Sequence, residues 1–363
     1  MLSTNKKMNL SSFKKIYLMV PANVSTGGPE ALHQLGYILK NLLDKDIKIF
    51  YVPADSANPV HDNYKKYSLN FTKHIEDDSD NLIIVPEYFN FLVKTLQFKK
   101  IKKLIWWLSI DNYIGSRFRA KNTKFFRSAY KLPFNIINFF NRFSKYFFGI
   151  LTIEEYLKFF YRFKDLNNHR EINQADFHVV QSYYAQNFLK DKLELVENLS
   201  DYIRDDFLSD KTKRLDNNQR KDIICYNPQK SNDFMNLIIE KTNFNFVPLI
   251  NLNNEQIIET LAKSKIYLDF GSHPGKDRLP REAALLGNCI ITNLKGSAAN
   301  SQDISIPQEF KFQENYKNLN HINDKIELIF NNYNKEFNKF NSYLNKILSE
   351  KETFIKEIKD IFK

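Results

Sequence analysis

Residues 267–300 read YLDFGSHPGKDRLPREAALLGNCIITNLKGSAAN, and this stretch decides the fold. The apolar run at 266–270 predicts a buried strand. Pro280 stands where a first helical turn favours proline, and Gly287 marks the end of that helix. Residues 289–292 (CIIT) predict the next strand. Strand, loop, short helix and strand form a βαβ unit, which indicates an α/β domain with a parallel sheet.

The loop inside this βαβ unit combines glycine with positive charge. It contains Gly271 and Gly275 and leads into three cations, Lys276, Arg278 and Arg281. Open α/β sheets bind ligands at the carboxyl ends of their strands, where this loop begins. Backbone N–H groups at a helix start, together with cations, suit a phosphate or a diphosphate. The alternative is that these cations are solvated surface residues.

Glu282 falls in the first turn of the predicted helix. Its carboxylate could accept hydrogen bonds from ribose hydroxyls, as acidic residues do in other nucleotide sites. It would also stabilise the helix dipole without any ligand. The chain has only nine glycines, and Gly271, Gly275, Gly287 and Gly296 all fall in this stretch. Glycines gathered at strand ends indicate a backbone that something approaches closely.

The segment PREAALLGNCIIT resembles the donor-nucleotide site of GT-B glycosyltransferases, which include the glycosyltransferase 4 group. The resemblance implies an α/β fold of two Rossmann-like domains that face each other across a cleft. It implies that Glu282 holds the donor ribose and that the three cations contact the diphosphate. The group's pattern has another Glu eight residues earlier, where this chain has Pro274 preceded by His273. A His-Pro pair also occurs in some transferases that use CMP-linked sugars, so that donor class stays open.

A second glycine loop lies near the N-terminus. Residues 14–22 predict a buried strand, and the following helix has leucines at helical spacing. These leucines are Leu32, Leu35, Leu39 and Leu42. The segment GGPEALHQL, which begins with Gly27 and Gly28, resembles the glycine loop of the N-terminal domain of GT-B enzymes. That resemblance implies a loop facing the donor phosphates and the acceptor; the alternative is an ordinary tight turn.

Candidate catalytic and acceptor-side residues follow from the strands of the same domain. Apolar runs at 47–52, 82–86 and 104–110 predict further strands of a parallel, doubly wound sheet. Asp111 and Asn112 come directly after the last of them. A carboxylate there could act as general base toward an acceptor hydroxyl, or it could cap the next helix from a turn. The rival candidates for catalytic or acceptor-side roles are Glu30, His33 and His273.

The second half of the chain repeats the alternation of strands and helices. A strand at 223–226 is followed by a loop with Asn227 and Lys230, and Gly296-Ser297 opens a later loop. Lys230 resembles the cation that reaches donor phosphates in GT-B enzymes. We therefore expect donor contacts from the following set: Gly28, Asn227, Lys230, His273, Gly275, Lys276, Arg278, Arg281, Glu282 and Ser297. Gly27, His33 and Asn112 are the expected acceptor-side residues.

These patterns predict the domain organisation. We expect an N-terminal acceptor domain over 1–200, with a helical insertion at about 113–170. A donor domain over 201–346 follows, with a charged, Asn-rich linker or exposed loop at 204–221 near its start. The resemblance to GT-B enzymes, in which a terminal helix commonly returns to the first domain, implies the same for a helix over 347–363.

The segment 117–163 is basic and aromatic. From Arg117 to Ile153 it has eight Lys or Arg and no Asp or Glu, and Phe pairs recur along it. Three interpretations stay open. The segment could lie in the interface of an anionic membrane, pack as a helical hairpin on the N-terminal domain, or bind nucleic acid by stacking and phosphate contact. No recognisable nucleic-acid motif accompanies it, so nucleic acid is the least favoured partner.

Composition limits the classes of function. The chain has 363 residues, a net charge of +11, 43% hydrophobic and 15% aromatic residues, which argues against disorder and favours an anionic partner. Its two cysteines fall in predicted strands, which indicates buried free thiols and fits a reducing cytoplasm. There is no apolar signal core, no run long enough to span a membrane, and no metal-ligand spacing. We expect a cytoplasmic protein, with a peripheral position on the inner face of the membrane as the alternative.

The interpretation that joins these features is a glycosyltransferase, of hexosyltransferase type. It would move a sugar from a nucleotide-sugar donor to a saccharide or lipid-linked acceptor in cell-surface polysaccharide or lipopolysaccharide synthesis. No cofactor and no metal are expected, because cations and helix N-termini can stabilise the departing phosphate. The competing class is a non-catalytic nucleotide- or lipid-binding protein with the same fold.

Overall fold

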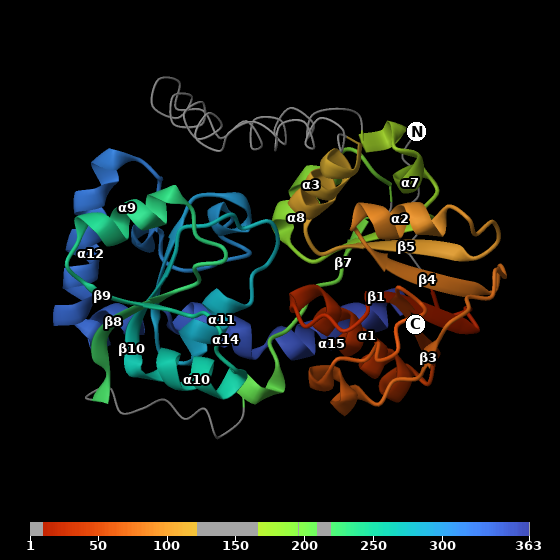
Figure 1. Cartoon of the computed structure of the whole chain (residues 1–363), viewed down its shortest axis with the longest axis horizontal. Coiled ribbons are helices and arrows are strands. Elements are labelled where there is room, and N and C mark those ends of the chain that lie inside the picture. The colour runs from red at the N-terminus through yellow and green to blue at the C-terminus, as the bar shows by residue number, and fades with distance from the viewer. Residues whose placement is uncertain (1–9, 122–165, 195, 209–218, 363) are drawn as a thin grey trace. The chain divides into compact units, whose positions relative to one another are not determined.

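The computed structural model describes residues 10–121, 166–194, 196–208 and 219–362 (Figure 1). Its residues divide into two compact units. The first unit comprises 1–181, 185–199 and 358–363, and the second comprises 182–184 and 200–357. No helix among the described residues is both long enough and apolar enough to cross a bilayer.

The first unit is built on a seven-stranded sheet of order β3-β2-β1-β4-β5-β6-β7. Its strands are β1 (Lys15–Pro21), β2 (Asp46–Val52), β3 (Phe71–Thr72), β4 (Asn81–Pro86), β5 (Lys102–Trp107), β6 (Phe177–Val180) and β7 (Val196–Asn198). All of the described strand pairs are parallel. Every residue of β4 is buried, as expected for a parallel sheet that is covered on both faces.

Helices cover both faces of this sheet. They are α1 (Gly27–Leu43), α2 (Phe89–Thr95), α3 (Ile110–Lys121), α7 (Arg170–Asn173) and α8 (Tyr183–Leu189), with 3-10 helices at Asp62–Tyr67 and Leu166–Asn168. In Figure 1, α1 lies on one side of the sheet and α2 and α3 on the other. The fully buried tryptophan Trp106 donates its indole N–H to the Leu199 carbonyl over 2.9 Å, which fixes the connection that leaves β7.

The second unit has a five-stranded sheet of order β12-β11-β10-β8-β9, and its described strand pairs are also parallel. Its strands are β8 (Lys221–Tyr226), β9 (Asn245–Pro248), β10 (Ser264–Asp269), β11 (Cys289–Asn293) and β12 (Lys311–Phe312). Its helices are α9 (Asp233–Lys241), α10 (Asn254–Lys263), α11 (Leu279–Leu285), α12 (Leu319–Asn331), α13 (Tyr333–Asn338), α14 (Asn341–Leu348) and α15 (Glu350–Phe362), the last residues of which belong to the first unit. Four further 3-10 helices are Asp205–Phe207, Gly296–Ala299, Gln308–Phe310 and Tyr316–Asn318. Figure 1 shows α10 and α11 on one face of the sheet and α9 and α12 on the other.

The predicted α/β architecture is confirmed, since both sheets are parallel and covered by helices. The predicted strand at 223–226 is present within β8. Both cysteines are buried and free, as predicted. The strand predicted at 104–110 is too long, because β5 ends at Trp107 and Ile110 already begins α3.

Two further sequence predictions concern segments that lie partly outside the described residues. Most of the basic aromatic segment 117–163 lies outside the described residues, which stop at 121 and resume at 166. Residues 209–218 of the charged segment 204–221 also lie outside them. The short strands β3, β7 and β12 were not predicted, because two or three residues give no readable alternation.

The leucine stripe of α1 is only partly buried. Leu32, Leu35 and Leu39 have no exposed surface, whereas Leu42 is 45% exposed. Leu42 lies in the last turn, just before the left-handed C-cap residue Asp44, where the helix no longer packs on the sheet. The prediction that Leu42 belongs to the buried face is therefore wrong.

The two ends of this stripe provide a matched pair of substitutions. We expect Leu35→Ala to lower the free energy of unfolding by about 2–5 kcal/mol, because it leaves a cavity in a packed core. Leu42→Ala removes the same atoms from a half-exposed position and is expected to change stability by less than about 0.5 kcal/mol. Urea denaturation of both variants measures this difference, and equal losses would contradict the assignment of α1 to the core.

Candidate functional site

Each sheet has one point where the strand order reverses, and doubly wound sheets bind ligands there. In the second unit that point lies between β8 and β10, which are followed by the loops 227–232 and 270–278. In the first unit it lies between β1 and β4, and the predicted glycine turn follows β1. The predicted site residues therefore lie at or next to these switch-point edges.

Glycines let the loops of the second unit touch through their backbones. A Cβ on Gly271 would lie 2.3 Å from the Lys230 carbonyl oxygen, and Gly271 pairs with Ser231 in an isolated β-bridge. Gly296 has a φ of +52°, and its Cβ would lie 1.9 Å from the His273 carbonyl oxygen. Both approaches exclude a side chain. At Gly271 and Gly296, therefore, what approaches the glycine is the chain's own backbone.

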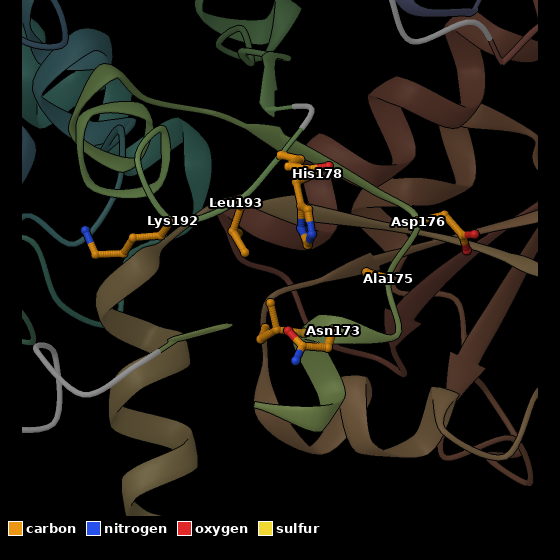
Figure 2. A pocket seen from close by; sticks show the side chains of 8 residues that line it. Asn173, Ala175, Asp176, His178, Lys192 and Leu193 are labelled. Carbon is orange, nitrogen blue, oxygen red and sulfur yellow. The ribbon is translucent and has the colours of Figure 1, made fainter. Parts of the chain in front are cut away.

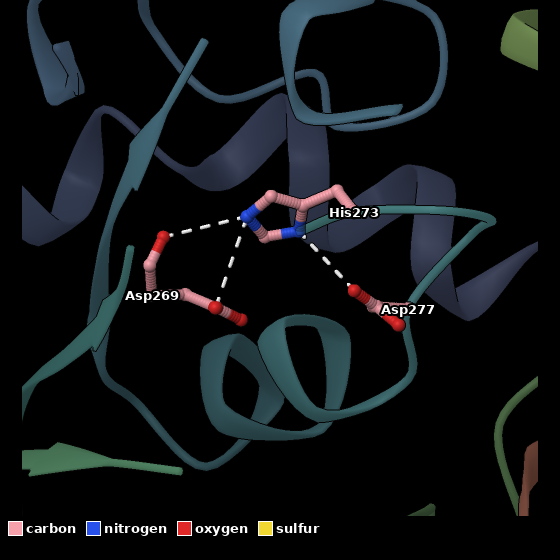
Figure 3. Close-up of side chains that lie close together, drawn as sticks. All are labelled: Asp269, His273 and Asp277. Atoms are coloured by element: carbon pink, nitrogen blue, oxygen red, sulfur yellow. Dashed lines mark hydrogen bonds and ion pairs between the residues drawn. The ribbon is translucent and has the colours of Figure 1, made fainter. Parts of the chain in front are cut away.

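A histidine of the loop 270–278 lies between two aspartates, one at the end of β10 and one in the same loop (Figure 3). His273 Nδ1 is 3.2 Å from Asp277 Oδ2, and Nε2 is 3.8 Å from Asp269 Oδ1 and 3.4 Å from the Asp269 carbonyl oxygen. The Tyr267 hydroxyl donates to Asp269 Oδ2 over 3.3 Å. The Lys230 ammonium contacts the other carboxylate oxygen of Asp277. Two carboxylates are thus linked by one imidazole ring and accompanied by one lysine.

Electrostatics favour the protonated form of this histidine. Burial alone would lower the pKa of His273, but the carboxylates of Asp269 and Asp277 raise it above its ordinary value. Burial alone would raise the pKa of Asp277, but Lys230 and His273 lower it. Burial raises the pKa of the Asp269 carboxyl, although His273 and Lys230 oppose this. When both carboxylates are ionised, an imidazolium and an ammonium balance the charge of the cluster. Such balance is what allows ionised groups to remain buried.

The same three residues have the ligand types of a metal site. One oxygen or nitrogen from each of Asp269, His273 and Asp277 lies within 4.8 Å of the others. Both nitrogens of the His273 ring, however, already face carboxylate or carbonyl oxygens, and Lys230 already contacts Asp277. This geometry matches a charge-balanced hydrogen-bonded cluster better than a set of ligands around an ion.

Two of the residues predicted to contact the donor are buried in this structure. The His273 side chain has no exposed surface, so in this structure it links Asp269 to Asp277 instead of contacting a donor sugar or phosphate. Ser297 is also fully buried, and its hydroxyl donates to the Gly275 carbonyl over 2.6 Å. Its backbone N–H donates to the His273 carbonyl over 2.9 Å. Ser297 thus holds the loop instead of presenting a hydroxyl to a ligand.

The three cations predicted to contact the diphosphate have partners within the second unit. Arg281 is 1% exposed and donates to Asp201 Oδ2 over 2.9 Å and to Glu350 Oε2 over 2.7 Å. Lys276 lies 2.8 Å from Glu350 Oε1, and Arg278 lies 3.5 Å from Asp201 Oδ2. We call these five residues the Arg281 cluster.

The Arg281 cluster is neutralised within the chain. Burial alone would raise the pKa of Asp201, but Arg281, helped by Lys276 and Arg278, lowers it to about 2. The carboxylate is therefore ionised and neutralised by these cations. With 9% and 12% of their side chains exposed, Lys276 and Arg278 have little surface left for a diphosphate, and Arg281 has almost none.

Because the Arg281 cluster is buried, we expect loss of its central cation to have a large effect on stability. Arg281→Met removes the cation between two buried carboxylates and is expected to cost about 3–5 kcal/mol of unfolding free energy. Lys263→Met is the control, because Lys263 and Glu259 form a pair whose side chains are 56% and 70% exposed, and such pairs contribute little. Chemical denaturation measures both. An Arg281→Met variant as stable as the control would show that the cluster does not hold this unit together.

The remaining predicted donor residues differ in accessibility. The Lys230 side chain is 41% exposed, which makes it the most open of the predicted cations. Asn227 is half-buried, and its side-chain oxygen accepts from the Gln229 N–H over 3.1 Å. Gly275 is buried, and Glu282 in the first turn of α11 is 6% exposed. The accessible part of this edge is therefore the loop after β8.

The carboxyl edge of the first sheet places several predicted residues near solvent. Gly27 is exposed and Gly28 half-buried at the start of α1, with a Cβ on Gly28 lying at 3.4 Å from the Leu108 side chain. Asp111 is half-buried and Asn112 exposed at the start of α3, directly after β5. The turn after β1 and the turn after β5 thus lie side by side.

Glu30 and His33 do not reach this open edge. His33 is 1% exposed; its Nδ1 lies 2.7 Å from the Pro29 carbonyl oxygen and its Nε2 lies 2.9 Å from the Tyr51 hydroxyl. Burial lowers the pKa of His33 to about 4, so the ring is neutral and packs as core. Glu30 is 3% exposed and accepts from the Tyr67 hydroxyl. The catalytic role of Glu30 and the acceptor-side role of His33 stay predictions, and in this structure both side chains pack against tyrosines.

The sequence interpretation missed Glu87. It directly follows β4 at the switch point of the first sheet and is 4% exposed. Its carboxylate accepts from the Leu108 N–H over 2.9 Å, and its burial raises its pKa to about 7. A signal was available, because an acidic residue immediately after a fully apolar strand must lie at the ligand-binding edge.

Glu87 predicts a specific pH dependence of stability. Between its unfolded value of 4.5 and its folded value of about 7, the folded state keeps a proton that the unfolded state has released, so stability falls as pH rises. The loss across this window is on the order of 3 kcal/mol. Glu87→Gln should flatten the dependence between about pH 5 and pH 8, whereas the exposed control Glu259→Gln should keep it. Urea titrations at several pH values measure this, and parallel curves for wild type and Glu87→Gln would refute it.

The known proteins that resemble this chain do so in their fold. No family model and no curated protein matches the chain. Among solved structures, a sucrose-phosphate synthase from Thermosynechococcus elongatus is 10% identical, with 96% of this chain and 98% of that chain covered and a TM-score of 0.59. HepE of Anabaena, in complex with UDP, is 8% identical over 95% and 98%, with a TM-score of 0.57. An alpha-glucosyltransferase in complex with UDP and DNA is 11% identical over 96% and 99%, with a TM-score of 0.54.

These neighbours are GT-B glycosyltransferases, and the likeness extends over nearly the whole of each chain. The chain therefore has the GT-B fold, as the resemblance of the segment PREAALLGNCIIT predicted. About one residue in ten is identical between this chain and these neighbours. A likeness at this level establishes the fold and does not identify the substrates.

Proposed function

We propose that the protein is a glycosyltransferase that uses a nucleotide-sugar donor. The observation that supports this most directly is the GT-B fold over 96% of the chain, with two doubly wound sheets that each have an edge suited to ligands. Two of the neighbouring structures contain UDP, which favours a nucleoside diphosphate as the leaving group. A hexose is the proposed sugar.

In this proposal the donor binds at the loop after β8. Lys230 is the proposed phosphate contact, because its ammonium is partly exposed and Asp277 fixes its position. A fixed cation stabilises charge that develops on a leaving phosphate. Asp277, which also contacts His273, connects this loop to the loop after β10. The reaction as proposed needs no bound metal, so chelation with EDTA should leave transfer unchanged.

Binding of nucleotides to the full chain tests this proposal. We expect one member of a panel of UDP-, GDP-, dTDP- and CMP-sugars to bind and to be turned over. Lys230→Met should reduce turnover by about 100-fold or more if the ammonium stabilises the leaving phosphate. The matched control is Lys265→Met, which removes a lysine paired with Asp222 at the start of β10, at the other end of the same sheet. Full turnover by Lys230→Met would remove this residue from the site.

The acceptor is proposed to be a saccharide or a lipid-linked saccharide. Asp111 and Glu87 are the proposed acceptor-side carboxylates, since both follow strands at the carboxyl edge of the first sheet. A carboxylate with a pKa of about 7 could accept the proton of an acceptor hydroxyl near neutral pH. Gly27, Gly28 and Asn112 are the proposed neighbours of the acceptor.

The competing proposal is a non-catalytic protein that binds a nucleotide with the same fold. Its support is that Arg281, Lys276 and Arg278, which a transferase could have used for the diphosphate, are engaged with carboxylates. The panel assay separates the two proposals, because saturable nucleotide binding without transfer or hydrolysis would favour the non-catalytic protein.

A role in polysaccharide or lipopolysaccharide assembly at the inner face of a membrane is a further proposal, based on the composition of 117–163. Eight cations without a single acidic residue between Arg117 and Ile153 would attract anionic lipids. The protein should cosediment with vesicles containing phosphatidylglycerol and be released by salt, and a variant with neutralised cations in 117–148 should stay in solution. Absence of binding at low salt would contradict the proposal.

A further inference from the structure

The first unit contains a cavity of about 290 Å³ (Figure 2). Its polar lining consists of Asn173, Asp176, His178, Lys192 and Glu194. These residues precede β6 and β7 or begin β6, so the cavity lies at the amino end of the sheet. The carboxyl edge with Asp111 and Glu87 is the opposite end, and the cavity shares no residue with it. The cavity volume lies just below the usual range for small-molecule sites.

His178 provides a fixed hydrogen-bond donor for this cavity. It is 6% exposed, and its Nδ1 accepts from the Trp107 indole N–H over 3.2 Å. The neutral ring must therefore have its proton on Nε2. Burial lowers the pKa of His178 to about 4, which keeps the ring neutral near pH 7. The ring points into the cavity in Figure 2, and no described residue accepts from Nε2.

The other polar groups of the cavity include both hydrogen-bond donors and hydrogen-bond acceptors. The side chains of Asn173 and Glu194 have no hydrogen-bond partner among the described residues. Asp176 accepts from Lys102 and from the Lys103 N–H but still lines the cavity. Lys192 is the only cation of the lining, and its ammonium donates to the Phe188 carbonyl over 2.7 Å.

This combination selects one class of ligand. Asp176 is paired with Lys102, and the lining has one more carboxylate, Glu194, and one lysine, Lys192, so there is no excess of positive charge to select an anion. The lining includes no Phe, Tyr or Trp that would favour a purely hydrophobic ligand. A ligand with several hydroxyl groups both accepts and donates, so it can satisfy a histidine N–H, an amide and carboxylates together. The apolar side chain of Leu193 is available for the carbon face of a sugar ring.

We propose that this cavity is a binding site for a saccharide or related polyol of about monosaccharide size, with one hydroxyl accepting the hydrogen bond of His178 Nε2–H. The site shares no residue with the proposed donor and acceptor residues. Saccharide binding here can therefore be tested independently of glycosyl transfer. It would allow a free sugar or the end of a glycan to bind the first unit.

The two tryptophans of the chain report directly on this site. The Trp107 indole N–H donates to His178, whereas the Trp106 indole N–H donates to the Leu199 carbonyl and serves as internal control. We would record the indole N–H resonances of the ¹⁵N-labelled full chain during titration with methyl α-glucoside, N-acetylglucosamine and glycerol. Inorganic phosphate is the anionic comparison.

The expected result is a saturable shift of the Trp107 resonance with a saccharide, an unchanged Trp106 resonance, and no response to phosphate. His178→Phe should abolish saccharide binding. If that variant does not fold, Asn173→Ala and Glu194→Ala, at exposed positions, should each weaken binding roughly three- to tenfold. No saturable Trp107 shift with any polyol, a response to phosphate alone, or unchanged affinity in both exposed-site variants would overturn the proposal.

Discussion

The buried guanidinium of Arg281 between Asp201 and Glu350 is the interaction on which the second unit depends. It joins three parts of the chain, since Asp201 lies 80 residues before Arg281 and Glu350 lies 69 residues after it. The first follows the exit from β7, and the second begins α15. Because an unpaired buried carboxylate is costly, loss of this cation would release both ends at once. The short helix α11 therefore serves as an anchor as well as part of the candidate site.

The loops at the edge of the second sheet are held by a second set of constraints. The backbone passes too close at Gly271 and Gly296 for any side chain, and His273 links Asp269 to Asp277 beneath them. Lys230 is attached to the same cluster through Asp277 but keeps part of its surface in solvent. The result is one positioned cation on a rigid edge. In the proposed reaction, preorganised charge of this kind would stabilise the departing phosphate.

Much of the fold could be predicted from the sequence, because parallel strands that are covered on both faces appear as unbroken apolar runs such as residues 82–86. The partners of the charged residues could not be predicted from the sequence. Arg281 and Lys230 look equivalent in sequence, and only the long-range approach of Asp201 and Glu350 makes one structural and leaves the other accessible. The surroundings of Glu30 and His33 could not be predicted for a similar reason, because tyrosines from β2 and from the 3-10 helix at 62–67 contact them. Glu87 could have been found, since it directly follows an apolar strand.

A structure of the protein with its bound nucleotide-sugar, or with the nucleoside diphosphate product, tests this account most directly. The account predicts that the diphosphate contacts Lys230 at the loop after β8, while Arg281 remains bound to Asp201 and Glu350. A diphosphate bound to the Arg281 guanidinium, with either carboxylate displaced, would contradict it.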